Sequence, residues 1–200
     1  PVIDQAFNPT VRRLQSLRVR GRAAVAGVPA GAGRPLRRSC GVPIDAPGAI
    51  QGGMMGPQER AAKVGETMFA VDVASKDTMG MELLLVEPGR AVIRMEVKAL
   101  HLNGHQICHG GFIFTLADST FAFACNSHNR NAVAAGCSIE FLKPAHAGDV
   151  LTCEGVEQTL QGRHGIHDMK VSNQKGEVIA MFRGKSAVIP GTVFPEEEGA

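Results

Sequence analysis

The segment FIFTLADSTFAFACNS, residues 112–127, is the most apolar stretch of the chain and decides its fold. The polar residues in its interior are Thr115, Asp118, Ser119 and Thr120, so the segment is hydrophobic around nearly its whole circumference. A helix with this pattern has to be buried by other structure. We therefore predict a helix that the rest of the domain covers.

Strand-forming runs flank this helix on both sides. The run before it contains Glu87-Pro88-Gly89-Arg90, a turn sequence that predicts a hairpin, and residues 57–75 before that predict an amphipathic helix. The predicted strands lie within residues 81–97, 132–142, 149–160 and 165–189. The order is helix, two strands, buried helix and four strands. It predicts an α+β hot-dog fold, in which an antiparallel sheet wraps around the long central helix.

Composition excludes several classes of protein. With 200 residues, 44% hydrophobic residues and a net charge of +2, the chain is typical of one globular domain. It has no run of about 18 apolar residues and no signal-peptide pattern, so we expect neither membrane insertion nor secretion. The five cysteines are odd in number and form no CxxC pair, which indicates a reducing, cytoplasmic setting.

The charge is unevenly distributed along the chain. Residues 1–53 carry a net +6 and are rich in Arg, Ala, Gly and Pro, whereas residues 54–200 carry a net −4. The first part has no apolar period, so we predict a disordered extension before a domain at 54–200. A transit peptide, a basic arm or sequence upstream of a natural start at Met54-Met55 are alternatives. The acidic domain argues against nucleic acid as a partner.

Asp118 is the strongest candidate for a catalytic group. It lies in the middle of the apolar helix, too far along to cap its start, and burial of an unpaired carboxylate raises its pKa. The structural alternative is an Asp that reaches solvent or bonds Thr115 or Ser119. Physical reasoning leaves the two interpretations equally supported.

The glycines just before this helix suggest a second catalytic element. In His109-Gly110-Gly111 the absence of side chains lets a ligand approach backbone N–H groups at the positive end of the helix dipole. Gly110 and Asp118 are eight residues apart, about 12 Å along one helix, too far to act on one carbonyl. We therefore expect a dimer with antiparallel central helices, in which the Gly110 of each protomer faces Asp118 of the other.

The string LNGHQICHGGFIFTLADSTFAFACNS, followed by SIEFLKPAHAGD and FRGKS, closely resembles the PaaI-type acyl-CoA thioesterases of phenylacetate degradation, which have the hot-dog fold. This resemblance spans most of residues 58–192. It implies hydrolysis of phenylacetyl-CoA or hydroxyphenylacetyl-CoA by a homotetramer of dimers, with Asp118 as catalytic carboxylate and Gly110 as donor to the thioester carbonyl. It implies no protein-bound cofactor, because coenzyme A is part of the substrate.

Further residues are candidates for contacts with the substrate. His109, Gly111, Phe112 and Asn103 lie at or before the helix start, and Phe112, Phe114 and Phe121 could line an aryl pocket or simply belong to the core. The basic groups expected to bind the coenzyme A phosphates are Lys143, Arg183 and Lys185.

Other chemistries are weakly supported. His101, His105 and His109 are spaced by four, but the intervening glycine argues for a loop and against a metal site. Cys108 beside His109 has no visible third group for a nucleophilic thiol, and Cys125 fits a buried apolar position. The remaining alternatives are a thioesterase for other aromatic or aliphatic acyl groups and a catalytically silent domain that binds acyl-CoA.

Overall fold

The apolar segment forms the central helix α3, Gly110–Asn126, in a computed structural model that describes residues 55–196. The expected disordered extension at residues 1–53 lies outside this range. Helix α3 begins two residues before the apolar run, because His109 is its N-cap. Gly110 and Gly111 are therefore part of its first turn. Its residues Leu116, Phe121 and Phe123 are fully buried.

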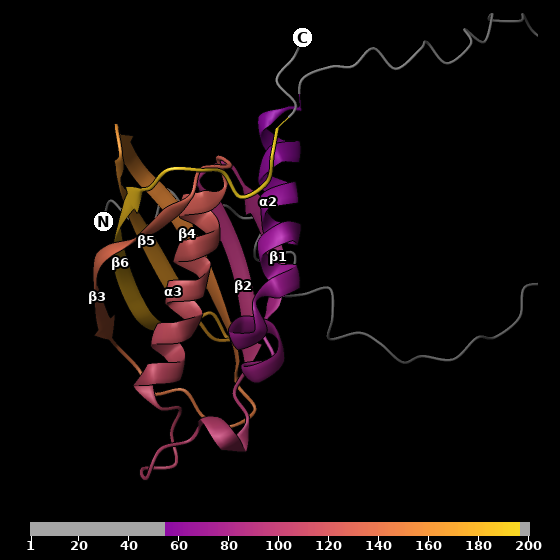
Figure 1. Ribbon diagram of the computed structural model, residues 1–200. Coiled ribbons are helices and arrows are strands. Elements are labelled where there is room, and N and C mark those ends of the chain that lie inside the picture. The colour runs from indigo at the N-terminus through magenta and orange to yellow at the C-terminus, as the bar shows by residue number, and fades with distance from the viewer. Residues whose placement is uncertain (1–54, 197–200) are drawn as a thin grey trace, which may run out of the picture. The chain divides into compact units, whose positions relative to one another are not determined.

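Six strands form one antiparallel sheet on which α3 lies (Figure 1). Their bounds are β1 Glu82–Glu87, β2 Arg90–Glu96, β3 Ala132–Phe141, β4 Val150–Gln161, β5 His164–Ser172 and β6 Val178–Val188. The order across the sheet is β1-β2-β4-β5-β6-β3, and every neighbouring pair is antiparallel. The predicted order of helices and strands and the hot-dog architecture are therefore confirmed.

Helix α2, Pro57–Val71, lies beside α3 and packs on β1 (Figure 1). Gly65 permits this close packing, because a Cβ atom there would lie 2.7 Å from Cγ2 of Val86. The helix ends four residues earlier than predicted, and a π-helical turn, η2 at Ala74–Thr78, follows it. Ser75 in this turn bonds Ser119 of α3, Oγ to Oγ, at 2.9 Å.

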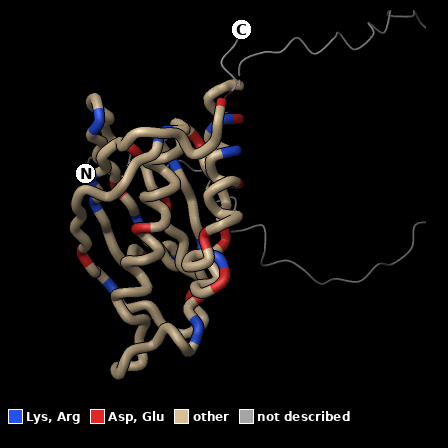
Figure 2. The backbone as a smooth tube through the Cα atoms, in the orientation of Figure 1, with Lys and Arg blue, Asp and Glu red and all other residues tan. Residues whose placement is uncertain are grey.

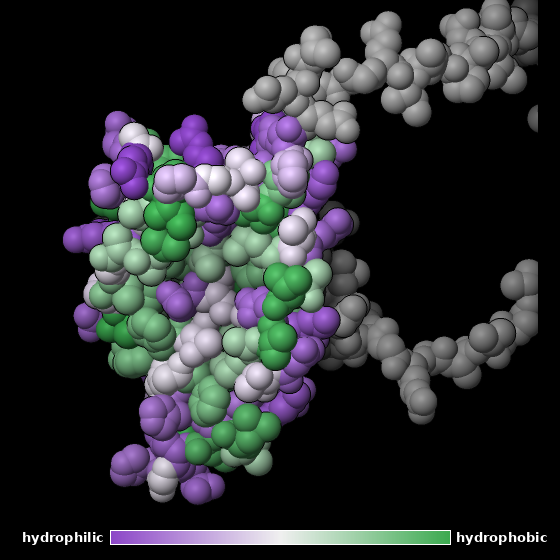
Figure 3. Space-filling model, viewed as in Figure 1, coloured by the Kyte–Doolittle hydropathy of each residue, from purple (hydrophilic) through white to green (hydrophobic). Residues whose placement is uncertain are grey.

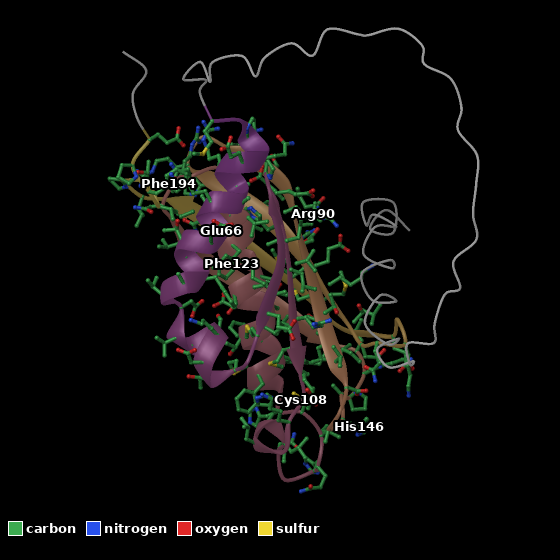
Figure 4. The ribbon with its side chains drawn as sticks, turned by 90° about the vertical axis from the view of Figure 1, so that its right-hand side faces the viewer. Glu66, Arg90, Cys108, Phe123, His146 and Phe194 are labelled. Atoms are coloured by element: carbon green, nitrogen blue, oxygen red, sulfur yellow. The ribbon has the colours of Figure 1, made fainter. Side chains whose placement is uncertain are left out.

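The C-terminal segment, residues 194–196, contacts both α2 and the loop after α3. Asn129 donates from Nδ2 to the carbonyl of Phe194 at 3.0 Å and accepts from its amide at 3.1 Å. Lys63 of α2 lies over the Phe194 ring, and Arg60 pairs with Glu196. Figure 4 shows Phe194 near the start of α2, so this C-terminal segment holds the helix in place.

One side of α3 is not covered by any described element. Along this side lie Gly111, Thr115, Asp118 and Ala122, which are exposed or half-buried. The neighbouring strand β3 is at the sheet edge and is exposed on both faces from Val133 to Ser138. Figure 3 shows hydrophobic surface gathered over this side of the molecule. The rest of the domain therefore covers most of α3, as predicted, and leaves this one side open.

Within the described residues, no helix is both long and apolar enough to span a membrane.

His167 of β5 is a titratable group in the core. The ring is fully buried against Phe121, at 5.3 Å between ring centroids. Neither ring nitrogen has a well-directed hydrogen bond, and Glu157 Oε2 lies 3.5 Å from Nε2. Burial lowers the pKa of His167, and His128 lowers it further, whereas Glu157 and Asp168 oppose this. The folded protein therefore keeps His167 neutral.

The state of His167 predicts a pH dependence of stability. In the unfolded chain His167 takes up a proton near the ordinary His pKa of about 6.5, whereas in the folded chain its pKa is lower. The free energy of unfolding is therefore highest above pH 6.5 and decreases as the pH falls below it. We expect His167→Gln to reduce the slope of unfolding free energy between pH 6.5 and 5 by at most about 1.4 kcal/mol per pH unit. Denaturant titrations at each pH measure this slope. His105→Gln, at an exposed loop position, should leave it unchanged, and equal slopes for all three proteins would contradict the prediction.

Candidate active site

The loop before α3 is anchored at both of its ends. Leu102 and Cys108 pair as an isolated β-bridge, and the Cys108 amide donates to the carbonyl of Ala145 at 2.8 Å. The His109 amide donates to the carbonyl of His101, also at 2.8 Å. Figure 4 shows Cys108 and His146 at the same end of the molecule. The segment after β3 therefore supports the loop from which α3 starts.

The first turn of α3 contains a backbone donor, the Gly110 N–H, that has no acceptor in the described part of the chain. His109 Nδ1 accepts the Gly111 N–H at 3.0 Å, and the Phe112 N–H donates to the His109 carbonyl at 2.9 Å. The Gly110 N–H lies at the positive end of the helix dipole, where a polarised carbonyl oxygen is favoured. Gly111, another predicted substrate contact, has its N–H already occupied.

Gly110 opens onto a groove of about 460 Å³, which we name the loop groove. Its lining residues are Asn103, Ile107, Cys108, Gly110, Ile113, Phe141, Leu142, Lys143 and Pro144. The groove brings together the predicted site residues Asn103, Gly110 and Lys143. Phe141 reaches closest to the backbone, because a Cβ atom on Gly110 would lie 3.1 Å from its Cζ.

Two polar side chains of the loop groove are held in defined positions. Asn103 Oδ1 accepts the His105 N–H at 2.8 Å, which orients the Asn103 side chain and leaves its Nδ2 group without an acceptor among the described residues. Lys143 Nζ pairs with Glu177 at 3.0 Å on the exposed rim. The groove thus offers two donors inside, Asn103 Nδ2 and the Gly110 N–H, and the cation of Lys143 at its edge.

Asp118 lies on the uncovered side of α3. It is half-buried, and its carboxylate forms no hydrogen bond or ion pair with the residues that the structure describes. Thr115 Oγ1 donates instead to the Gly111 carbonyl at 2.8 Å, and Ser119 bonds Ser75. Burial raises the pKa of Asp118. Asp118 is also the single charged residue of α3, whereas charge is plentiful on α2 (Figure 2).

The loop groove does not include Asp118 of the same chain. Both Gly110 and Asp118 belong to the straight helix α3, and eight residues separate them, which corresponds to about 12 Å. One protomer therefore contains both elements but does not bring them together.

The other predicted site residues lie elsewhere. Phe112 packs against His101, with ring centroids 4.7 Å apart, and Phe114 packs against Phe182 at 5.6 Å. Phe182 faces α3, so the alternating side chains of β6 place Arg183 and Lys185 on the opposite face of the sheet. Arg183 there forms a bidentate ion pair with Asp168, at 2.6 and 2.7 Å.

The alternative chemistries find little geometric support. His101 is buried, and its Nδ1 accepts the Lys98 N–H at 3.0 Å. Residues 55–196 contain no cluster of three His, Cys, Asp or Glu side chains that could hold a metal ion. Burial raises the pKa of the Cys108 thiol to about 11 and that of Cys125 to about 12, so both stay protonated at neutral pH.

Sequence reasoning missed Phe141 as a groove residue. Phe141 is 52% exposed although Ile139, on the same face of β3, packs against the core. Alternation along a strand predicts a core position for both residues. Phe141 is the last residue of β3 and lines the loop groove, whereas Ile139 lies further inside the strand.

Comparison with known proteins gives consistent results. Residues 105–180 match the family model of the thioesterase superfamily. The chain is 45% identical over 134 residues to the acyl-coenzyme A thioesterase PaaI of Escherichia coli K12, covering 64% of this chain and 91% of that protein.

Two solved structures extend this comparison. The E. coli PaaI protein of the phenylacetic acid degradation operon superimposes with a TM-score of 0.67 at 41% identity, over 68% of this chain and 99% of that one. A Streptococcus mutans protein bound to acetyl CoA superimposes with a TM-score of 0.55 at 28% identity, over 56% and 90% of the two chains.

Proposed function

This chain belongs to the thioesterase superfamily, among its PaaI-type acyl-CoA thioesterases, and on that premise we propose that it hydrolyses phenylacetyl-CoA or hydroxyphenylacetyl-CoA in phenylacetate degradation. The products are the free acid and coenzyme A. The observation that carries the proposal is that α3 has both a Gly110 N–H without an acceptor and an unpaired, half-buried Asp118 on its open side, among the described residues.

The active unit in this proposal is a dimer. The open side of α3 and the exposed edge strand β3 adjoin each other and are largely apolar. Unpaired strand edges and apolar patches of this kind favour association with a second copy. A two-fold axis that sets the two α3 helices antiparallel brings Gly110 of one protomer to the partner's Asp118, and does so twice. The larger homotetramer implied by the family resemblance stays a prediction.

The reaction follows from these two groups. The Gly110 N–H, reinforced by the dipole of α3, stabilises negative charge on the thioester oxygen. The ionised carboxylate of the partner's Asp118 either removes a proton from the attacking water or attacks the acyl carbon itself. In the first route a water oxygen bonds to the acyl carbon, the C–S bond breaks, and the proton taken up by Asp118 passes to the sulfur of coenzyme A. In the second route the carboxylate forms a mixed anhydride with the acyl group as the C–S bond breaks, and a water then hydrolyses the anhydride and supplies the proton for the thiolate. Both routes require Asp118 without its proton.

The loop groove provides a place for coenzyme A. Asn103 Nδ2 is positioned to donate to the pantetheine or to the carbonyl, and Lys143 at the rim can pair with a phosphate. Arg183 and Lys185 face away from this groove, so we assign the phosphate contact of one protomer to Lys143. No protein-bound cofactor takes part in this scheme, and the cytoplasmic setting stays a prediction.

Thiol release from a panel of coenzyme A esters tests the proposal. We expect the full chain to release thiol from phenylacetyl-CoA and 4-hydroxyphenylacetyl-CoA with the highest kcat/KM in the panel. The other esters of the panel are acetyl-CoA, octanoyl-CoA and benzoyl-CoA. Rates at the uncatalysed background for every ester, with measurable binding of coenzyme A, would support the silent acyl-CoA-binding domain instead.

A further inference from the structure

A second groove, which we name the helix groove, lies between α2, α3 and the start of β3. It has a volume of about 390 Å³ and includes Met68 and Val71 from α2, Ala122 from α3, Val133 from β3 and Ile189 beyond β6. None of the residues lining this groove is charged. The loop groove, by contrast, has Lys143 at its rim.

The polar groups of the helix groove are mostly used by the protein itself. Asn126 Nδ2 donates to the carbonyls of Ala122 and Ala132 at 2.9 and 3.0 Å, and its Oδ1 accepts the Ala132 N–H at 2.9 Å. Asn131 donates from its backbone N–H to the carbonyl of Gly191 at 3.2 Å and from Nδ2 to the carbonyl of Pro190 at 3.5 Å. The groove therefore presents mainly apolar side chains to a ligand.

The helix groove lies next to the candidate catalytic carboxylate. Ala122 follows Asp118 by four residues, so the two occupy the same side of α3, one turn apart and about 6 Å along its axis. A thioester with its carbonyl carbon at Asp118 has its acyl group within reach of this groove. In the proposed dimer, coenzyme A then extends the other way, toward the partner's Gly110 and the loop groove beside it.

We propose that the helix groove binds the acyl group and that Ala122 sets the size of the group accepted, an inference that rests on the thioesterase function proposed above. The occupant is an uncharged, mainly apolar acyl group such as phenylacetyl. An acyl group with a terminal carboxylate is rejected, because no cation lines the groove to pair with it. Ala122 is decisive because the groove is lined by two residues of α3, Ala122 and Asn126, and Asn126 is held by its hydrogen bonds to Ala122 and Ala132.

Two opposite changes of groove size test this inference. Ala122→Leu places a larger side chain in the helix groove. The ratio of kcat/KM for phenylacetyl-CoA to that for acetyl-CoA should therefore fall at least about tenfold. Met68→Ala widens the groove, so octanoyl-CoA should gain relative to phenylacetyl-CoA. Succinyl-CoA, with its charged acyl end, should be the poorest substrate of the native chain. Ala62→Leu, at an exposed position of α2, is the matched control and should leave every ratio unchanged.

The outcomes separate this inference from the function on which it rests. If the native chain hydrolyses none of the esters, the proposed thioesterase activity fails. If it hydrolyses them but neither Ala122→Leu nor Met68→Ala changes a ratio, the activity stands and the groove assignment is wrong. A groove that instead receives a second copy of the chain predicts that Ala122→Leu lowers the mass in sedimentation and reduces all rates equally, which also overturns the assignment.

Discussion

Asp118→Asn is expected to lower kcat for phenylacetyl-CoA by about a thousandfold, within the range of 10² to 10⁴ for loss of a general base. The amide keeps the size of the side chain but neither accepts a proton from water at neutral pH nor attacks the acyl carbon. The carboxylate has no hydrogen-bonding partner among the described residues, so its replacement breaks no structural contact there. Thiol release under saturating substrate measures the loss.

The raised pKa of Asp118 predicts two further results for the same variant. The native enzyme is active with Asp118 ionised, so kcat/KM should fall as pH decreases through a pKa above the ordinary Asp value. Because the folded state holds this proton more tightly than the unfolded chain, ionised Asp118 lowers stability above that pH. Asp118→Asn should therefore unfold at no lower denaturant concentration than the native chain at pH 7.

Asp77→Asn is the matched control for this prediction. Asp77 is an exposed carboxylate in η2, and its replacement should change neither kcat nor the acidic limb of the pH profile. Near-native turnover by Asp118→Asn would remove Asp118 from the mechanism, whatever its effect on stability.

The second large effect is complementation between two inactive variants. Gly110→Pro removes the proposed oxyanion donor and should lower kcat by about 10² to 10³. Proline suits this first helical position, because His109 before it is extended with φ −63° and ψ 133° and the lost N–H has no acceptor among the described residues. Mixed dimers of Gly110→Pro and Asp118→Asn chains contain one site with both intact groups. Random pairing should restore about 25% of native activity, because half the dimers are mixed and each has one complete site.

Gly110→Ala separates loss of the donor from crowding. It places a Cβ atom 3.1 Å from Cζ of Phe141, as proline also does, but it keeps the N–H. Phe141 is an exposed side chain that can move, so we expect Gly110→Ala to retain far more activity than Gly110→Pro. Co-refolded Gly110→Pro and Asp118→Asn chains that stay at the level of the separate variants would exclude a site shared between protomers.

Some features of the site could be read from local patterns. The apolar run predicted α3 and placed Asp118 within it, and the glycines after His109 indicated an accessible backbone donor. Helical spacing along one axis was enough to show that Gly110 and Asp118 are about 12 Å apart. These inferences hold because helix geometry depends on residues close in sequence.

Other features depend on contacts between distant segments. The support of the loop before α3 by the carbonyl of Ala145 and the direction of Arg183, set by the register of β6, are examples. The helix groove joins Met68, Ala122 and Ile189, which no spacing in the sequence connects.

By itself, the order of residues determined the helices and strands, the hot-dog class and the position of Asp118 and Gly110 on one helix, because each of these reflects periodicity over a few neighbouring residues. Only the tertiary structure decided that β3 is an edge strand, that one side of α3 stays open and that two separate grooves flank this side. Strand order and exposure arise from pairing between segments far apart in the chain, and local periodicity carries no information about which pairs form.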